Sequence, residues 1–205
     1  MANFFAILCA YLLGSLSFAV IVSRCMSIPD PHTYGSGNPG ATNVLRSGKK
    51  IAAALTLIGD SAKGWLAVWL AIKLQDYWHL NTITIALVAI AVLLGHMWPI
   101  FFRFKGGKGV ATAVGILLAL SWPTALICAI VWLIIALGFK VSSLAALVAT
   151  LISPLVAWYF MNHHSWIWAT VAIAILVLYR HQSNIKKLIQ GKESKIGDIA
   201  DKSDR

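Results

Sequence analysis

Charged residues are scarce in this sequence: Asp, Glu, Lys and Arg make up 12% of its 205 residues. A soluble domain carries about 25% of these residues, so the shortage excludes an ordinary soluble protein. Cysteine is also scarce, and Cys9, Cys25 and Cys128 form no CxxC pair. Because the HExxH and GxSxG patterns are absent too, we predict no bound metal, and any chemistry must come from positioning and electrostatics.

Long apolar runs fill the chain instead, with 59% hydrophobic residues and a mean hydropathy of +0.78. A helix needs about 20 apolar residues to cross a bilayer. We therefore predict an all-α, polytopic membrane protein with seven transmembrane helices, two of them short because the "SWPT" turn at 121–124 divides one long run. The predicted spans are residues 2–24, 51–74, 82–101, 109–121, 123–139, 142–160 and 165–181.

A formal net charge of +10 is typical of proteins that bind nucleic acids, and also of membrane proteins whose cytoplasmic loops are basic. In this chain, however, the cations lie between apolar runs. With seven spans, all 17 Lys and Arg residues except Lys63 and Lys73 fall on one side of the membrane. The positive-inside rule then predicts an outside N-terminus, a cytoplasmic C-terminus and no nucleic-acid partner. We expect a single domain over 1–205, ending in a loosely ordered tail at 191–205.

The first unusual polar segment is "YGSGNPGATNVLR", residues 34–46. Asn38 is predicted to cap a helix whose first turn opens with Pro39 and Gly40. The N–H groups of that helix and of the Gly-Ser-Gly backbone would form a concave anion site, to which Arg46 adds a guanidinium fork. A glycine-rich turn, with Arg46 marking the inner interface, explains the segment equally well.

The second segment is "FKGGKGVAT", residues 104–112, where three glycines and two lysines directly precede a predicted helix. This arrangement is typical of loops that hold anions. It is not a Walker A loop, because Lys108 is followed by Gly109 rather than by Ser or Thr. A basic inner loop that merely obeys the topology would explain the lysines but not the glycines.

The third segment is "YRHQSNIKKLIQGKE", residues 179–193, in which His181 and Asn184 share one helical face. An interfacial amphipathic helix, with Lys186 and Lys187 near lipid headgroups, is the alternative interpretation. It explains the lysines better than the histidine.

Two polar pairs lie in or beside the predicted spans. Asp60 and Lys63 are three residues apart and would be costly alone in a membrane, so we predict a structural polar pair. Ser142 and Ser143 open the span at 142–160 on the inner side. With the three polar segments on the same face, the sequence predicts a site for anionic, phosphorylated ligands.

The stretches "GSGNPGATNVLR", "GHMWPIFFRFKGGKGVAT" and "RHQSNIKKLIQGKE" together resemble the PlsY family, integral-membrane acyl-phosphate:glycerol-3-phosphate acyltransferases of bacteria. The resemblance runs from residue 1 to about 195. It implies transfer of a fatty acyl group from acyl phosphate to the 1-hydroxyl of glycerol 3-phosphate. The products are 1-acyl-glycerol 3-phosphate (lysophosphatidic acid) and inorganic phosphate, in the first step of phospholipid synthesis.

The resemblance also implies roles for particular residues. The catalytic candidates are Ser36, Arg46, Lys105, His181 and Asn184. The candidates for binding substrate phosphate are Ser36, Gly37, Asn38, Gly40, Thr42, Arg46, Lys105, Gly106, Gly107, Lys108, Gly109, Ser142, Ser143, His181 and Asn184. The run "GFKVSS" departs from the family's usual Gly-Tyr-Ser-Ser, which weakens the assignment of the two serines. Glu193 is expected to tie down the tail, and His181 either orients a substrate or acts as the general base.

The expected partners are acyl phosphate, glycerol 3-phosphate and membrane lipid, with no cofactor, and the enzyme is expected to be a monomer. By the same resemblance, its place is the bacterial cytoplasmic (inner) membrane, multi-pass, with the active site facing the cytoplasm. A membrane transporter or flippase for phosphorylated metabolites or lipids is the alternative, since it also needs anion sites on the inner face. Transporters usually place their site near the midplane, however, and the polar clusters here are at one face.

Overall fold

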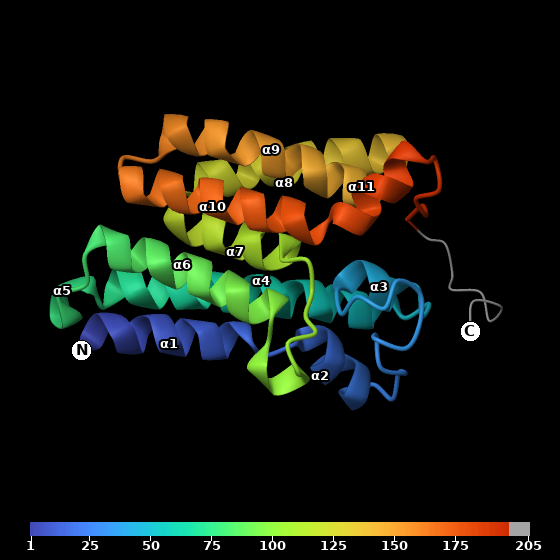
Figure 1. Ribbon diagram of the computed structural model, residues 1–205, viewed down its shortest axis with the longest axis horizontal. Helices are drawn as coiled ribbons and strands as arrows, with labels where there is room; N and C mark the ends of the chain where they lie inside the picture. Colours follow the sequence, from blue (N-terminus) through green and yellow to red (C-terminus); the bar gives the residue numbers. More distant parts are fainter. Residues whose placement is uncertain (197–205) are drawn as a thin grey trace.

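The computed structural model describes residues 1–196, which form helices joined by short loops and contain no strand. Figure 1 shows the helices in chain order. They are α1 (Ala2–Gly14), α2 (Phe18–Cys25), α3 (Ala41–Leu45), α4 (Lys50–Lys73), α5 (Gln75–Trp78), α6 (Thr82–Met97), η1 (Ile100–Phe102), α7 (Val110–Leu120), α8 (Trp122–Phe139), α9 (Ser142–Phe160), α10 (His164–Arg180) and α11 (Gln182–Ile189).

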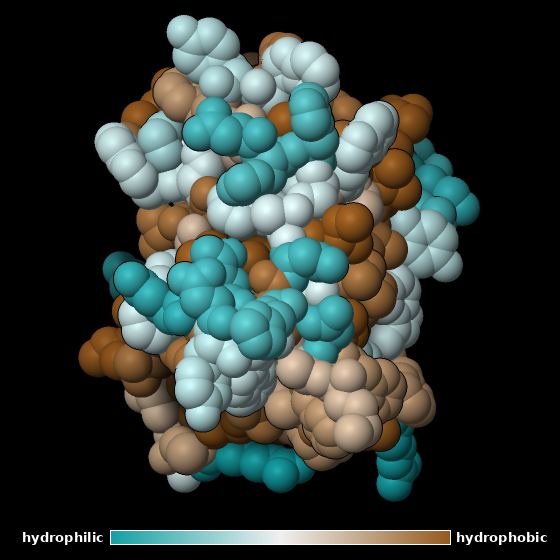
Figure 2. All heavy atoms as spheres, turned by 90° about the vertical axis from the view of Figure 1, so that its left-hand side faces the viewer, coloured by the Kyte–Doolittle hydropathy of each residue, from teal (hydrophilic) through white to brown (hydrophobic). Residues whose placement is uncertain are grey.

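The long helices run along one common axis, so the bundle has two ends (Figure 1). The N-terminus and α5 lie at one end, and α2, α3 and α11 lie at the other. Figure 2 looks at the end with α5, where hydrophilic side chains gather. Along the sides, large apolar residues such as Leu137, Leu151 and Leu155 are exposed. Polar ends and apolar sides are what a bundle that spans a bilayer requires.

Within residues 1–196, four helices are long and apolar enough to cross a membrane: α4, α8, α9 and α6 together with η1. The bent pair α1 and α2 makes a fifth candidate span, and α7 and α10 are apolar but shorter. The predicted break between 109–121 and 123–139 is present, because α7 ends at Leu120 and α8 begins at Trp122 with Pro123 in its first turn.

The first predicted span, 2–24, is not one continuous helix. It bends by 42° between α1 and α2. At the break, the carbonyl oxygen of Leu16 accepts a hydrogen bond from Lys63 Nζ of α4 at 2.6 Å. A side chain that satisfies a freed backbone carbonyl makes such a break tolerable within an apolar bundle. The bend directs α2 toward the end of the bundle that carries α3 (Figure 1).

The core lies around α6, where Ile85, Val92 and Leu93 are fully buried. This helix packs against α1, α4 and α10, while α4 also packs along α7 and α8 along α9. Small residues permit these contacts: Gly14 of α1 lies against Val92 of α6, and Gly115 of α7 lies against Ser61 of α4. Close packing through small residues is how membrane helices associate. The bundle thereby fixes the ends of α4, α7, α9 and α10 around a common space.

Candidate active site

One cavity of about 370 Å³ opens at the end of the bundle that carries α3 and α11. Its polar part is lined by residues from all three segments that the sequence singles out. Its apolar part runs between α7, α8, α9 and α10. Among the apolar lining residues are Leu117, Cys128, Trp132, Ala149, Ile173 and Val177. The cavity therefore joins a polar mouth to an apolar slot.

The first loop (residues 26–40) is organised by Asn43, whose side chain is buried. Asn43 Oδ1 accepts from the Ser36 N–H at 3.0 Å. Asn43 Nδ2 donates to the carbonyl oxygens of Pro31 at 2.8 Å and Tyr34 at 3.2 Å. One amide thus ties together three points of the loop that precedes it.

This arrangement corrects two predictions for the first segment. The helix begins at Ala41 with Gly40 as its N-cap, and no side chain caps it. Asn38 does not cap it because the Gly40 N–H donates to the Asn38 carbonyl at 2.9 Å in a tight turn that holds Pro39 outside the helix. The N–H groups of Ser36, Gly37 and Gly40 all donate within the protein, so these three are not free to bind an anion.

What the first loop presents to the cavity is side chains and the start of α3. The predicted residues of this segment that line the cavity are Ser36, Asn38, Gly40, Thr42 and Arg46. Gly37 is not among them. Its backbone has φ of +64°, a conformation that only glycine adopts without strain, so it shapes the turn instead.

The second loop (residues 103–109) packs backbone against backbone. The Gly107 N–H donates to the carbonyl oxygen of His96 at 3.1 Å. A Cβ at Gly106 would collide with that same carbonyl oxygen, and a Cβ at Gly107 would collide with the imidazole of His96. The glycines of this loop therefore permit close packing, and the N–H of Gly107 is already used.

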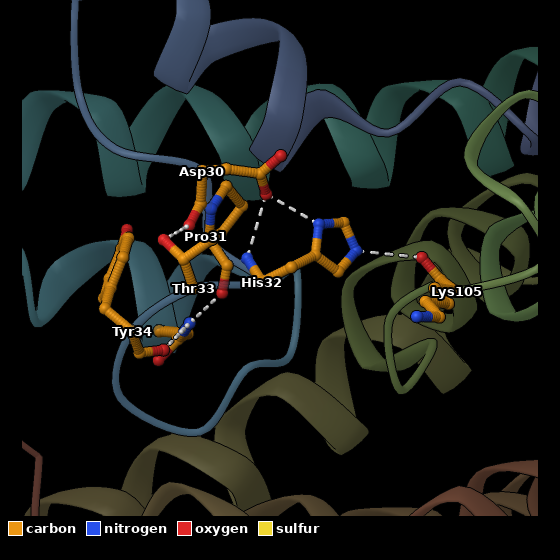
Figure 3. Close-up of polar contacts among 7 residues, drawn as sticks. Asp30, Pro31, His32, Thr33, Tyr34 and Lys105 are labelled. Atoms are coloured by element: carbon orange, nitrogen blue, oxygen red, sulfur yellow. Dashed lines mark hydrogen bonds and ion pairs between the residues drawn. The ribbon is translucent and has the colours of Figure 1, made fainter. Parts of the chain in front are cut away.

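Two side chains from outside the loop hold it in place. Arg180, the last residue of α10, donates from Nη2 to the Gly106 carbonyl at 2.7 Å and from Nε to the Gly107 carbonyl at 3.2 Å. Figure 3 shows His32 of the first loop, which reaches Asp30 through Nδ1 at 2.6 Å and the Lys105 carbonyl through Nε2 at 3.0 Å. The first loop and the third segment are thus both fastened to the second loop.

The two lysines of the second loop differ in position. Lys105 is exposed. Lys105, Gly106 and Gly107 are not among the residues that line the cavity. Lys108 and Gly109 do line it. Burial lowers the pKa of the Lys108 amine to about 8; the Glu193 carboxylate opposes this shift, and the nearby Arg46 guanidinium adds to it. Lys108 therefore lines the cavity, whereas Lys105 is exposed outside that lining.

In the third segment, His181 and Asn184 are buried and both line the cavity. His181 Nδ1 lies 2.7 Å from the Val177 carbonyl oxygen, which can only accept, so Nδ1 donates. Asn184 Nδ2 donates to Glu193 Oε1 at 2.7 Å. The expected role of Glu193 in tying down the tail thus has a specific partner.

The tail segment (residues 191–196) lies at the cavity mouth, where Glu193 and Ser194 belong to the lining. Arg46 Nη2 donates to Ser194 Oγ. The Ile196 N–H donates to the Lys140 carbonyl at 2.6 Å. The prediction of a loosely ordered tail therefore does not describe residues 191–196, because they make these contacts. Residues 197–205 lie outside the described part of the chain.

Asp60 and Lys63 form an ion pair with 2.8 Å between Oδ1 and Nζ, and both side chains are buried. Asp60 Oδ1 also lies 3.5 Å from His96 Nδ1. Asp60 and His96 line the cavity, at its inner wall on α4 and α6. The pair links the helix break at Leu16 to the wall of the site.

Ser142 and Ser143, at the first turn of α9, both line the cavity. The Ser143 hydroxyl is buried and has no hydrogen-bond partner among residues 1–196. Leaving such a group unpaired costs about 1–3 kcal/mol. A ligand that accepts a hydrogen bond from Ser143 would remove this cost.

Sequence reasoning missed the residues that fasten the three segments together: His32, Asn43, Arg180 and Ser194. Asn43 and Arg180 stand within or next to the quoted stretches, so their proximity was a usable signal. His32 and Ser194 act across 73 and 148 residues of sequence, and one chain read alone holds no signal for such pairs.

A family model for glycerol-3-phosphate acyltransferase matches residues 4–191. The chain belongs to the glycerol-3-phosphate acyltransferase family. A protein of that name from Neisseria gonorrhoeae (strain NCCP11945) is 68% identical over 198 residues, which cover 97% of this chain and 99% of that protein. The predicted family and enzyme class are confirmed.

Solved structures agree with this family assignment. The chain is similar to the crystal structure of PlsY (YgiH), an integral membrane glycerol 3-phosphate acyltransferase, in its glycerol 3-phosphate form. The TM-score is 0.89 at 36% identity over 96% of both chains. The lysophosphatidic acid form gives a TM-score of 0.88 at 35% identity over 97% of both chains. This acyltransferase is therefore an all-helical, multi-pass membrane protein.

Proposed function

We propose that the chain transfers a fatty acyl group from acyl phosphate to the 1-hydroxyl of glycerol 3-phosphate. The products are 1-acyl-glycerol 3-phosphate and inorganic phosphate, in the first step of bacterial phospholipid synthesis. Family membership supports the acceptor, and a glycerol 3-phosphate form of the related PlsY is known. The structure of the cavity supports the donor.

The observation that carries the proposal is the two-part character of the single cavity. Acyl phosphate has a charged head and a long apolar chain, so it needs a cationic pocket continuous with an apolar one. The cavity provides both, with Arg46 and Lys108 at the polar end and the slot between α7, α8, α9 and α10 at the other. In this proposal the head lies at the mouth and the acyl chain lies in the slot.

Each polar group then has a task. Arg46 and Lys108 offset the charge of two phosphates held close together, since Arg forms bidentate bonds and Lys supplies a point charge. Ser36 of the first loop and Thr42 of the first turn of α3 add hydrogen bonds. The Ser143 hydroxyl, buried and without a partner in residues 1–196, donates to the oxygen of the acyl carbonyl or of its phosphate.

Acyl phosphate is a mixed anhydride, so the leaving group is already good and no covalent enzyme intermediate is needed. The hydroxyl oxygen attacks the carbonyl carbon, the bond to phosphate oxygen breaks, and phosphate leaves with that electron pair and the hydroxyl proton. Holding the reactants in position supplies about 7–11 kcal/mol of the barrier reduction. A donor to the developing oxyanion supplies about 2.7–4 kcal/mol.

In this proposal His181 orients the acceptor, and the substrate phosphate takes the proton. His181 Nδ1 donates to the backbone carbonyl oxygen of Val177 rather than to a carboxylate, so no ion pair at this nitrogen stabilises an imidazolium. Turnover of His181→Asn and His181→Ala measured across pH tests this assignment. We expect a reduced rate with the wild-type pH profile, and loss of one limb of the profile in both variants would identify His181 as the base instead.

We also propose seven spans, with the N-terminus outside and the active site at the cytoplasmic face of the bacterial inner membrane. The bundle supports this proposal, because the N-terminus and α11 lie at opposite ends (Figure 1), as an odd number of crossings requires. The cations gather at the end with α3 and α11.

A transporter or flippase fits the observations less well. It would need polar groups near the midplane to carry a phosphorylated cargo. The charged residues deep in α4, Asp60 and Lys63, are paired with each other and bound to the break in the first span. They are therefore already occupied by structural partners.

The test is phosphate release from palmitoyl phosphate by purified protein in detergent, with and without glycerol 3-phosphate. We expect release that depends on glycerol 3-phosphate and yields equimolar lysophosphatidic acid. Arg46→Gln should abolish it, whereas Arg24→Gln, an exposed arginine on α2, should leave it unchanged. Release that does not depend on glycerol 3-phosphate would overturn the assignment.

A further inference from the structure

The side-chain amide of Asn184 has a single possible orientation. One of its two heavy atoms lies 2.7 Å from Glu193 Oε1. A carboxylate oxygen can only accept, so the amide group that faces it must be the NH₂ donor. The amide oxygen, Oδ1, is consequently directed away from Glu193.

Asn184 Oδ1 has no partner within the described chain. It is buried, and no donor in residues 1–196 reaches it. Asn184 as a whole is 8% exposed and lines the cavity. Because buried polar atoms are normally paired, the missing donor comes from outside the described chain, and the cavity gives a ligand access to this atom. Asn184 Oδ1 is thus available to accept a hydrogen bond from a ligand hydroxyl or amine.

His181 is prepared in the same way, one helical turn earlier. Its Nδ1 donates to the Val177 carbonyl at 2.7 Å, so in the neutral ring Nε2 carries a lone pair. His181 and Asn184 are three residues apart and lie on one face of the chain. Two acceptors, each fixed by a bond to a second group, therefore belong to residues that line the same cavity. Glycerol 3-phosphate carries two neighbouring hydroxyl donors, which match them.

We propose that Glu193 is a positioning residue that fixes the Asn184 amide so that Oδ1 accepts a hydrogen bond from a hydroxyl of glycerol 3-phosphate. This inference rests on the proposed function and names how that site recognises its acceptor. It also gives the tail segment a part in the reaction, because residue 193 acts from outside the helical bundle.

The inference also explains why an acidic residue stands beside a phosphate site. A carboxylate there repels the substrate, a cost that the cations Arg46 and Lys108 help to offset. Glutamine would keep the length but could offer either its oxygen or its NH₂, and Asn184 could then adopt either orientation. Glutamate offers acceptors alone, so it leaves Asn184 one orientation.

The test is a set of variants at 193 and 184 assayed with palmitoyl phosphate and glycerol 3-phosphate. In Glu193→Gln and Glu193→Ala we expect the KM for glycerol 3-phosphate to rise about three- to tenfold, the factor that one hydrogen bond represents. The KM for palmitoyl phosphate should stay within about twofold, since Asn184 Oδ1 pairs with glycerol 3-phosphate rather than with palmitoyl phosphate. Lys192→Ala, an exposed neighbour, is the control and should match wild type in both constants.

The swapped pair Asn184→Asp with Glu193→Gln separates positioning from mere tail attachment. There the glutamine NH₂ donates to one carboxylate oxygen of residue 184 and leaves the other as the acceptor. We expect its KM for glycerol 3-phosphate to lie closer to wild type than that of Asn184→Asp alone. If the single variants at 193 fail to fold, comparing the double variant with Asn184→Asp still tests whether residue 193 positions the side chain of residue 184.

Three results would overturn the inference. The first is wild-type KM values for both substrates in folded Glu193→Ala. The second is an equal rise of both KM values in the variants at 193. The third is a swapped pair whose KM for glycerol 3-phosphate is no lower than that of Asn184→Asp. A failure of the proposed function looks different, because wild-type protein would then release phosphate without any dependence on glycerol 3-phosphate.

Discussion

The two glycine-bearing loops resemble each other in sequence and differ in how they are built. The first loop is shaped by a side chain, because Asn43 bonds to three of its backbone groups. The second loop is shaped by close contact, because its glycines lie directly against His96. In both loops, N–H groups predicted to hold an anion donate within the protein. Glycine-rich loops beside a phosphate site can therefore serve to direct side chains, rather than backbone N–H groups, toward the ligand.

The largest effect should come from removing the close contact in the second loop. In Gly107→Ala the new Cβ would collide with the His96 imidazole, and we expect a loss of about 3 kcal/mol of stability with no measurable acyl transfer. Thermal unfolding in detergent and the phosphate-release assay measure both. Gly138→Ala is the control, since nothing lies within 4 Å of that position. A Gly107→Ala protein with wild-type activity would contradict the close-contact account.

Asn43→Asp should have the next largest effect, because it removes both donors to the first loop. The Pro31 and Tyr34 carbonyls lose their partner, and we expect a loss of about 2 kcal/mol and a raised KM for both substrates. The exposed Asn162→Asp is the matched control. If Asn43→Asp melts at the wild-type temperature, the first loop is held by something other than this amide.

How far the sequence predicts the fold depends on the range of the interaction. Apolar runs are local, so the all-helical bundle and the break at Ser121 could be predicted from length and turn residues. The bend after Gly14 could not, since it depends on Lys63 reaching the Leu16 carbonyl 47 residues away. The cap at Asn38 was wrong because local propensity favours it, whereas the Gly40 turn prevents it.

The same limit applies to the candidate site. Residue types and their common membrane face predict Arg46, His181 and Asn184, and these three do line one cavity. Lys105 and Lys108 stand three residues apart in one basic loop, so sequence cannot tell which side chain turns inward. That choice follows from how the second loop folds against His96 and Arg180.

Raising the pH should weaken substrate binding through Lys108. Burial lowers the pKa of this amine to about 8, so between pH of about 7 and about 9 it loses its proton and its charge. Phosphate monoesters keep their charge over this range, since their second pKa is about 6. We therefore expect KM for the phosphorylated substrates to rise up to about tenfold, the scale of one pH unit beyond the pKa. Lys108→Arg stays charged and should show a flat profile, and a rise that persists in this variant would assign the titration elsewhere.

The smallest effect should come from the turn glycine of the first loop. Gly37 has φ of +64°, and the nearest atom to an added Cβ is the His32 carbonyl oxygen at 3.5 Å. Gly37→Ala therefore adds strain but no collision, and we expect a loss of about 1 kcal/mol with activity retained. A collapse as severe as that of Gly107→Ala would show that the two loops are built alike.

The most direct test of the account is the comparison of Lys108→Ala with Lys105→Ala. In the proposed function, side chains that line the cavity bind phosphate, and Lys108 lines the cavity whereas Lys105 is exposed. We predict that Lys108→Ala raises the KM for phosphorylated substrates at least about tenfold, as loss of a charged hydrogen bond does. Lys105→Ala should stay near wild type. The reverse order, with Lys105→Ala the more damaged of the two, would show that phosphate is not bound mainly by the side chains that line the cavity.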